Sequence, residues 1–214
     1  ALRGYKAMGS VTFEASLFNI ATGPSGSAVA TGSILSNGKV SFNVYLPDGS
    51  RGSYSGPVVN GDLIVLHTRG KSGGRPVLMG TLKVQNLAGQ SDFSGAVRLF
   101  AASGSVGSLF PTGYDQDRSL TGSRYVKPAK GTLPMKGFPV TANNAVFNWV
   151  DGNFASVQKV GTWATNGRMT IPPTPTDRAA AKFDAKTGLL TLTYTRTDVA
   201  RNLLNTTSKA FAVV

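Results

Sequence analysis

One stretch decides the fold class of this chain: Ile34-Leu35-Ser36-Asn37-Gly38-Lys39-Val40-Ser41-Phe42-Asn43-Val44-Tyr45. Val40, Phe42 and Val44 alternate with more polar residues, which is the two-residue period of a half-buried β-strand. Asn37-Gly38 suits the pair of positive φ angles that a type I′ hairpin turn requires. The stretch therefore predicts an antiparallel hairpin with a type I′ turn.

The same pattern extends in both directions through the first hundred residues. Turn signals at 47–50, 60–61 and 70–74 separate short runs in which apolar and polar residues alternate. Strands are expected at 11–18, 28–35, 40–45, 51–57, 63–68, 77–84 and 93–100. We therefore predict a first β lobe over residues 1–106, a meander of six or seven strands that curls or closes to hide its edges.

Residues 107–117 contain Pro111 and Gly113 and have no sustained period, so they predict a linker. Alternation returns after it and predicts a second β lobe over 118–214. Its strands are expected at 119–126, 145–150, 157–164, 168–171, 180–184, 189–195 and 208–213, and 198–205 is the best place for a helical turn. The expected fold is all-β, with two antiparallel barrel- or sandwich-like lobes and very little helix.

The segment Phe183–Tyr194 repeats the pattern of Ile34–Tyr45 with one additional turn residue. Each segment ends in an alternating apolar strand that closes on a tyrosine. Two interpretations stay open, because hairpins converge readily: a duplication that produced two related lobes, or two unrelated hairpins.

Composition restricts the function classes. The 22 Lys and Arg residues outnumber the 10 Asp and Glu residues, which gives a basic protein with a net charge of +12. Such a surface attracts polyanions, including acidic glycans and nucleic acid, in a salt-sensitive way. The absence of cysteine excludes disulfides, thiolate catalysis and cysteine-ligated metals. No stretch approaches the roughly 18 apolar residues of a membrane-spanning helix.

Catalytic chemistry has few candidates. His67 is the only histidine, so any Ser-His-Asp triad would need it, and no Gly-x-Ser-x-Gly elbow accompanies it. One imidazole cannot form a histidine metal cluster, and we expect no metal and no cofactor. The segment 70–75 has a Lys-Ser pair between glycines, but the flanking strands indicate a hairpin tip and not a phosphate loop.

The ten acidic residues offer only one close pair. Most of them occupy turn positions, where Asx-type hydrogen bonding explains them. The close pair is Asp115-Gln116-Asp117, and the following Arg118 argues against a calcium loop. The sequence therefore predicts that the chain is not an enzyme; a glycan-acting enzyme with an acid pair is the second alternative.

Aromatic and basic residues of the second half suggest a binding surface. Aromatic rings beside a positive groove bind sugars and single-stranded nucleic acid by stacking, although core packing also explains rings in strands. The candidate ligand-binding residues are Trp149, Trp163, Arg124, Tyr125, Lys127 and Arg168. The first alternative function is therefore a module that binds an acidic glycan, a surface polymer or, without sequence specificity, nucleic acid.

A series of short motifs runs in order along most of the chain: Gly32-Ser33-Ile34, Asn37-Gly38-Lys39-Val40, Leu46-Pro47-Asp48-Gly49-Ser50, Gly80-Thr81-Leu82, Asp92-Phe93-Ser94-Gly95, Gly122-Ser123-Arg124-Tyr125 with Pro128, and Phe183-Asp184-Ala185-Lys186-Thr187-Gly188-Leu189. Their order and spacing resemble a β-rich repeat module found toward the C-terminus of large exported proteins of Verrucomicrobia and Planctomycetes. The resemblance implies an extracellular or cell-surface location, other domains of a larger parent protein as partners, and no catalytic residues. The preferred function is a non-catalytic spacer, adhesion or assembly element.

Overall fold

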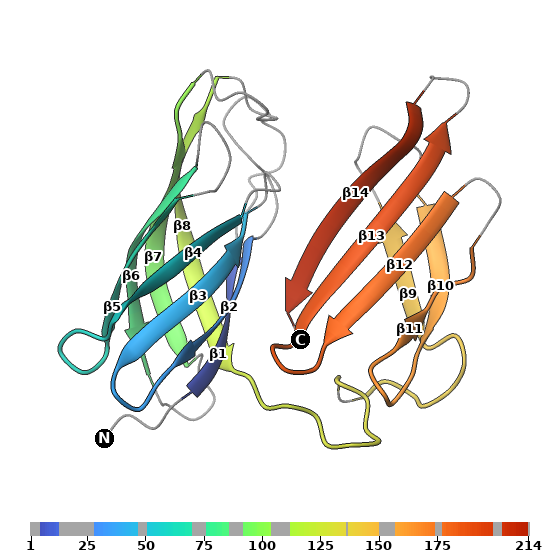
Figure 1. The fold of residues 1–214 in the computed structure, drawn as a ribbon, viewed down its shortest axis with the longest axis horizontal. Helices are drawn as coiled ribbons and strands as arrows, with labels where there is room; N and C mark the ends of the chain where they lie inside the picture. The colour runs from blue at the N-terminus through green and yellow to red at the C-terminus, as the bar shows by residue number, and fades with distance from the viewer. Residues whose placement is uncertain are drawn as a thin grey trace. The chain divides into compact units, whose positions relative to one another are not determined.

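The fold is all-β, as the sequence predicts. A computed structural model describes residues 5–12, 28–46, 51–69, 76–85, 92–103, 112–135, 137–149, 157–173, 177–198 and 203–213. These ranges contain fourteen strands and no helix (Figure 1). A membrane-crossing helix, which needs length and sustained apolarity, is therefore not found in the described part of the chain.

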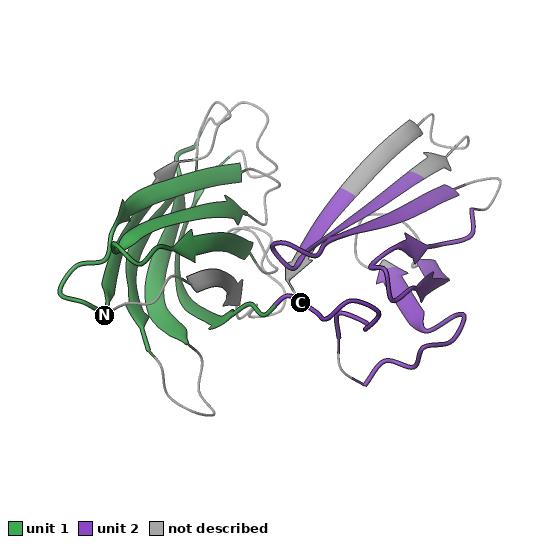
Figure 2. Cartoon of the chain, turned by 60° about the horizontal axis from the view of Figure 1, so that its bottom comes forward, with its two compact units in different colours: residues 1–126, 213 green, residues 127–212, 214 purple. Residues whose placement is uncertain are grey.

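The chain divides into two compact units between Val126 and Lys127 (Figure 2). The boundary differs from the predicted linker at 107–117, because the strand Tyr114–Arg124 belongs to the first sheet. This strand pairs with both Tyr5–Thr12 and Phe93–Ala101. A local pattern does not reveal a ladder between such distant segments, which is why the sequence assigns 118–124 to the second lobe.

The first unit is a single eight-stranded sheet, one or two strands more than predicted. Its strands are β1 (Tyr5–Thr12), β2 (Ala28–Ile34), β3 (Lys39–Tyr45), β4 (Arg51–Pro57), β5 (Leu63–Arg69), β6 (Val77–Val84), β7 (Phe93–Ala101) and β8 (Tyr114–Arg124). The order is β4-β3-β2-β1-β8-β7-β6-β5. Successive strands are thus neighbours except β4 and β5, while β1 pairs with β8. The sheet curls without closing into a barrel.

One face of this sheet forms the core of the first unit. Alternate residues point inward, as in β3, where Val40, Phe42 and Val44 are buried and the residues between them are not. Two inward glycines allow the curl: a Cβ at Gly32 would collide with the Ser41 carbonyl and the Phe42 ring, and a Cβ at Gly95 with the Thr81 carbonyl. Glycine in a strand commonly marks such close backbone approach.

The second unit contains two three-stranded sheets. Its strands are β9 (Ala145–Trp149), β10 (Val157–Trp163), β11 (Met169–Thr170), β12 (Asp177–Asp184), β13 (Leu189–Asp198) and β14 (Leu203–Val213). The sheets have the orders β11-β10-β9 and β12-β13-β14, and an isolated bridge from Arg168 to Lys182 joins them. The predicted helical turn at 198–205 is wrong where it is described, because Asp198 and 203–205 lie in strands; 199–202 lie outside the described residues.

The hairpin at Asn37-Gly38 is confirmed, but its turn type is not. Of the two residues only Gly38 has a positive φ, 80°, and the backbone NH of Leu35 donates to the Lys39 carbonyl across three loop residues. This is the three-residue loop in which a left-handed glycine follows a type I turn. The type I′ pair occurs instead at Asn60 and Gly61, with φ values of 51° and 84°.

The second unit contains the same three-residue turn. The NH of Ala164 donates to the Arg168 carbonyl, and Gly167 has a φ of 81°. In both turns the asparagine side chain accepts from the basic residue two positions later, Asn37 from Lys39 and Asn166 from Arg168. Local sequence therefore determines this turn in the same way in two different sheets.

Candidate functional site

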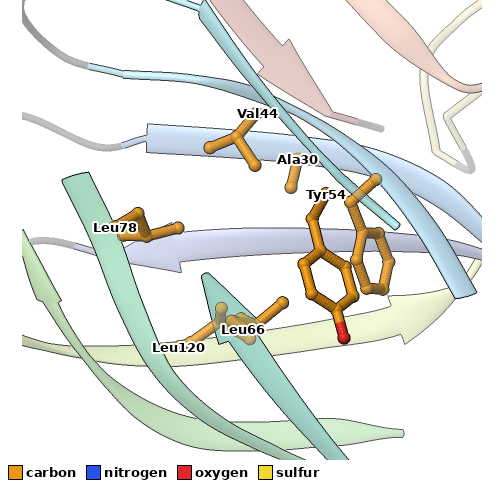
Figure 3. A pocket seen from close by; sticks show the side chains of 7 residues that line it. Ala30, Val44, Tyr54, Leu66, Leu78 and Leu120 are labelled. Atoms are coloured by element: carbon orange, nitrogen blue, oxygen red, sulfur yellow. The ribbon is translucent and has the colours of Figure 1, made fainter. Parts of the chain in front are cut away.

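The curled sheet of the first unit encloses one small apolar cavity among the described residues. Its lining side chains come from six strands (Figure 3): Ala30, Phe42, Val44, Tyr54, Leu66, Leu78 and Leu120. Its volume is about 20 Å³, and no polar surface faces it. A space of this size has room for about one water molecule, which would find no hydrogen-bonding partner there. The cavity is therefore a packing gap and not a ligand site.

Arg118 lies on the inward-facing side of β8, because it pairs with the buried Val97 and is two residues from the buried Leu120. Its Nη2 donates to the Gln116 Oε1 at 2.5 Å, and its Nη1 donates to the Asp117 carbonyl at 3.1 Å. These bonds hold the guanidinium against its own strand. Asp115 and Asp117 have the opposite parity and are exposed on the outer face.

One member of the predicted acid pair, Asp115, forms a salt bridge with an arginine. Asp115 accepts two hydrogen bonds from Arg98, through Nε and Nη2, across the ladder between β7 and β8. The hydrogen bond from Arg98 holds the pKa of Asp115 below its ordinary value, with the charge of Arg98 acting in the same direction. A general acid for glycoside hydrolysis needs the opposite shift. The Arg98–Asp115 pair thus acts as a structural link between β7 and β8 on the sheet surface.

Other described carboxylates also have structural roles. Asp62 lies 3.8 Å from the Lys83 Nζ, and Asp92 accepts the backbone NH of Arg124 at 2.6 Å. Asp184 closes the turn after β12, where the Lys186 NH donates to it; this bond lowers the pKa of Asp184. Metal-binding groups of three or more His, Cys, Asp or Glu residues do not occur in the described ranges. Glu14, Asp48 and Asp151 fall outside those ranges.

The second unit contains a nearly buried polar cluster. The Lys159 Nζ on β10 lies 2.6 Å from Asp177 Oδ1 at the start of β12, and these side chains are 12% and 13% exposed. Tyr194 on β13 donates to Asp177 Oδ2 at 3.4 Å and is itself buried. The cluster therefore links the two sheets of the unit.

His67 lies on the outer face of β5 opposite Met79, where both side chains are exposed. It is thus on the opposite side of the sheet from the inward-facing Leu66. The glycine-rich segment 70–75, which is predicted to be a hairpin tip, lies outside the described residues.

Trp163 does not form a stacking platform. It is 3% exposed and packs edge-to-face against Phe138 and Phe183, with ring centroids 6.2 and 5.4 Å away. Its buried indole NH has no hydrogen-bond partner among the described residues. The side chain of Trp149 lies outside the described part of the structure. The two tryptophans on which the predicted surface depended therefore supply no exposed ring in the described structure.

The basic candidates Arg124, Lys127 and Arg168 are exposed. Arg124 and Tyr125 end the first unit, and Lys127 begins the second. Arg168 lies on the opposite face of its hairpin from Trp163, because Trp163 pairs with Met169, the neighbour of Arg168. The isolated bridge instead places Arg168 opposite Lys182, which is not among the predicted binding residues. The only signal was the alternation of Arg178, Ala180 and Lys182 along the strand.

No family model, curated protein or solved structure is similar to the chain in the comparisons made. The resemblance to a repeat module of exported proteins therefore stays a prediction.

Proposed function

We propose that the chain is a non-catalytic β module of an exported or cell-surface protein, where it acts as a spacer, adhesion or assembly element. The observation that carries the proposal is that three of the described carboxylates are bonded to structural partners. Asp115 binds Arg98, Asp177 binds Lys159 and Asp184 binds its own turn. The extracellular or surface location rests on the family resemblance.

The electrostatics support a structural role for these groups. A general acid or base works best when its pKa lies near the operating pH, which for a carboxyl requires a raised value. The hydrogen bonds at Asp115 and Asp184 lower the pKa of each carboxyl. Both groups stay ionised at neutral pH and serve as fixed acceptors.

A hydrolysis panel tests this proposal. The full chain is assayed against neutral and acidic polysaccharides, peptides, carboxylic esters and phosphate esters, and we expect no turnover with any of them. His67→Ala and Asp115→Asn are assayed in parallel, because these residues are the best catalytic candidates on the outer face. A turnover that either substitution abolishes would contradict the proposal. A cytoplasmic location of the parent protein in fractionated cells would contradict export.

A specific observation favours a second candidate function, a binding module for polyanions. Arg168 and Lys182 are exposed and lie opposite one another, in a chain with a net charge of +12. A salt-dependent, saturable titration would separate this function from that of a pure spacer, which binds nothing. The third candidate, a glycan-acting enzyme, has less support because Arg98 keeps Asp115 ionised.

A further inference from the structure

The outer face of the second unit carries an ordered set of cations and hydroxyls. By strand alternation, one side of β10 to β13 presents residues that are exposed or half-buried. We call this surface the threonine–cation face, and it consists of Thr162, Arg168, Thr170, Arg178, Lys182, Thr191, Thr193 and Thr195. Thr162 pairs with Thr170, Lys182 pairs with Thr191 and Arg178 pairs with Thr195, so the set spans both sheets.

Arg168 and Lys182 form a like-charged pair across the bridge between the sheets. Directly opposed residues have Cβ atoms about 5 Å apart, and like charges in this arrangement are destabilising. A carboxylate or sulfate placed between the two heads would remove the repulsion and accept hydrogen bonds from both. The pair therefore has the charge pattern of an anion site.

Among the described residues, the face has one carboxylate of its own, Asp184, which is two residues from Lys182 on the same side of β12; besides the Lys186 NH, the charge of Lys182 helps to lower the pKa of this carboxyl. Asp177 faces the interior with Lys159. Asp184 stands at the end of β12, where the Lys186 NH and the Thr187 hydroxyl donate to its carboxylate. Arg178 is four residues from Lys182, about 13 Å along an extended strand. An extended ligand along β12 would thus meet a cation at each end.

The neutral groups of the face select among polyanions. Threonine hydroxyls donate and accept hydrogen bonds, which suits the hydroxyl groups of sugars. The described aromatic residues of these strands, Phe147, Trp163, Phe183 and Tyr194, all have the opposite parity and face the interior. The face thus lacks the stacking platforms of single-stranded nucleic acid binding.

We propose that the threonine–cation face binds an extended acidic polysaccharide. Arg168 and Lys182 bind one anionic group of this ligand, and Arg178 binds a second. The inference deepens the proposed function and rests on it, since it specifies the surface and partner of an adhesion module. The polysaccharide lies along β12, and the flanking threonines bond to its sugar hydroxyls.

A matched pair of variants tests the face. Arg168→Gln/Lys182→Gln removes two charges from it, and Lys39→Gln/Lys130→Gln removes two exposed charges elsewhere. Lys39 is an apt control because it occupies the position of Arg168 in the same type of turn. Binding of the full chain to polygalacturonate is titrated calorimetrically at about 50 and 200 mM salt, with neutral dextran as the blank. We expect saturable, salt-weakened binding that falls about tenfold in the first variant and less than about twofold in the control.

Stability provides a second readout of the same pair. Arg168→Glu converts the repulsion into an attraction to Lys182, so we expect a higher urea midpoint for the second unit together with weaker polygalacturonate binding. A structural role alone would not move stability and binding in opposite directions. A lower midpoint would contradict the geometry of the pair.

The outcomes separate this inference from the proposed function. Equal losses in the two double variants would show attraction by diffuse charge and would overturn the face, while leaving a non-catalytic module intact. Tighter binding of single-stranded DNA than of polygalacturonate would overturn the choice of partner. Cleavage of polygalacturonate would contradict the proposed function. If cleavage were seen, a loss of binding in Arg168→Gln/Lys182→Gln but not in the control variant would still support the threonine–cation face as the binding surface.

Discussion

The two units build their interiors in different ways. Among the described residues, the first unit surrounds a core cluster of 17 buried apolar residues with one curled sheet. The corresponding cluster of the second unit has three buried residues, Ala145, Phe147 and Ile171, between strands of two sheets. The second unit adds the Lys159–Asp177 ion pair, which has no described counterpart in the core of the first. A continuous curled sheet can hold its shape by apolar burial, whereas two short sheets are joined here by directional bonds as well.

The side-chain hydrogen bonds of the second unit act both within one sheet and between its two sheets. Asn144 bonds to the backbone of Trp163 in both directions, through Nδ2 at 3.0 Å and Oδ1 at 2.7 Å. Lys159 and Tyr194 reach Asp177 from different sheets. A buried ion pair adds little net stability relative to apolar packing, but removing one partner is costly. The comparison therefore teaches that the units should respond to different substitutions.

The largest loss of stability is expected from a substitution in the apolar core of the first unit. Phe93→Ala removes a 2% exposed ring and should destabilise the first unit by about 3–5 kcal/mol. Phe100→Ala on the same strand is the control, because that ring is 40% exposed, and it should cost less than about 1 kcal/mol. Both tryptophans lie in the second unit, so urea unfolding followed by circular dichroism reports both units and tryptophan fluorescence only the second. Equal effects of the two variants would contradict the described core.

The next effect is expected from the ion pair of the second unit. Lys159→Met leaves Asp177 nearly buried without its cation, which should cost about 3 kcal/mol, the lower end for a broken buried pair, since both groups keep some exposure. Lys159→Met/Asp177→Leu should recover most of this loss. The measurement is the fluorescence-detected urea transition, with the exposed Lys130→Met of the same unit as control. If the double variant were no more stable to urea than Lys159→Met alone, Lys159 and Asp177 would not act as a unit.

The smallest effect is expected at the turn after β12. The Lys186 NH lowers the pKa of Asp184, so the ionised carboxylate stabilises the folded state above the ordinary aspartate pKa of about 3.9. This contribution is lost as pH falls through the lower folded pKa. Asp184→Asn should cost less than about 1 kcal/mol at pH 7, because the carboxyl is only partly buried, and the difference in stability from wild type should shrink as the pH falls through the lowered pKa of Asp184. If the stability difference between wild type and Asp184→Asn grew on acidification, the pKa of Asp184 would be raised and not lowered in the folded state.

Much of the fold could be predicted because its signals are local. Alternation located strands such as Lys39–Tyr45 and Val77–Val84, and the Asn-Gly pairs located their turns. The pairing of β1 with β8 could not be predicted, and with it the unit boundary at Val126. The turn type at Asn37-Gly38 also could not be predicted, because the same dipeptide is compatible with a two-residue or a three-residue loop. The register of the flanking strands decides between these loops.

The candidate site was predicted only in part. Arg168 was selected for its charge, but its partner Lys182 became visible only through the bridge between the sheets. Trp163 was selected as a surface ring and is instead a core residue between Phe138 and Phe183. Alternation shows that a residue lies on one of two faces; it does not show which face the rest of the chain covers.

The amino-acid sequence by itself determined the strands, most turns, the basic charge and the absence of thiol chemistry, since each depends on neighbouring residues or on composition. The tertiary structure alone decided that β8 completes the first sheet, that Lys159 meets Asp177 and that Arg168 stands opposite Lys182. The physical reason is that a two-residue period encodes how a strand presents its faces. Which strand lies beside it depends on the packing of segments far apart in the chain.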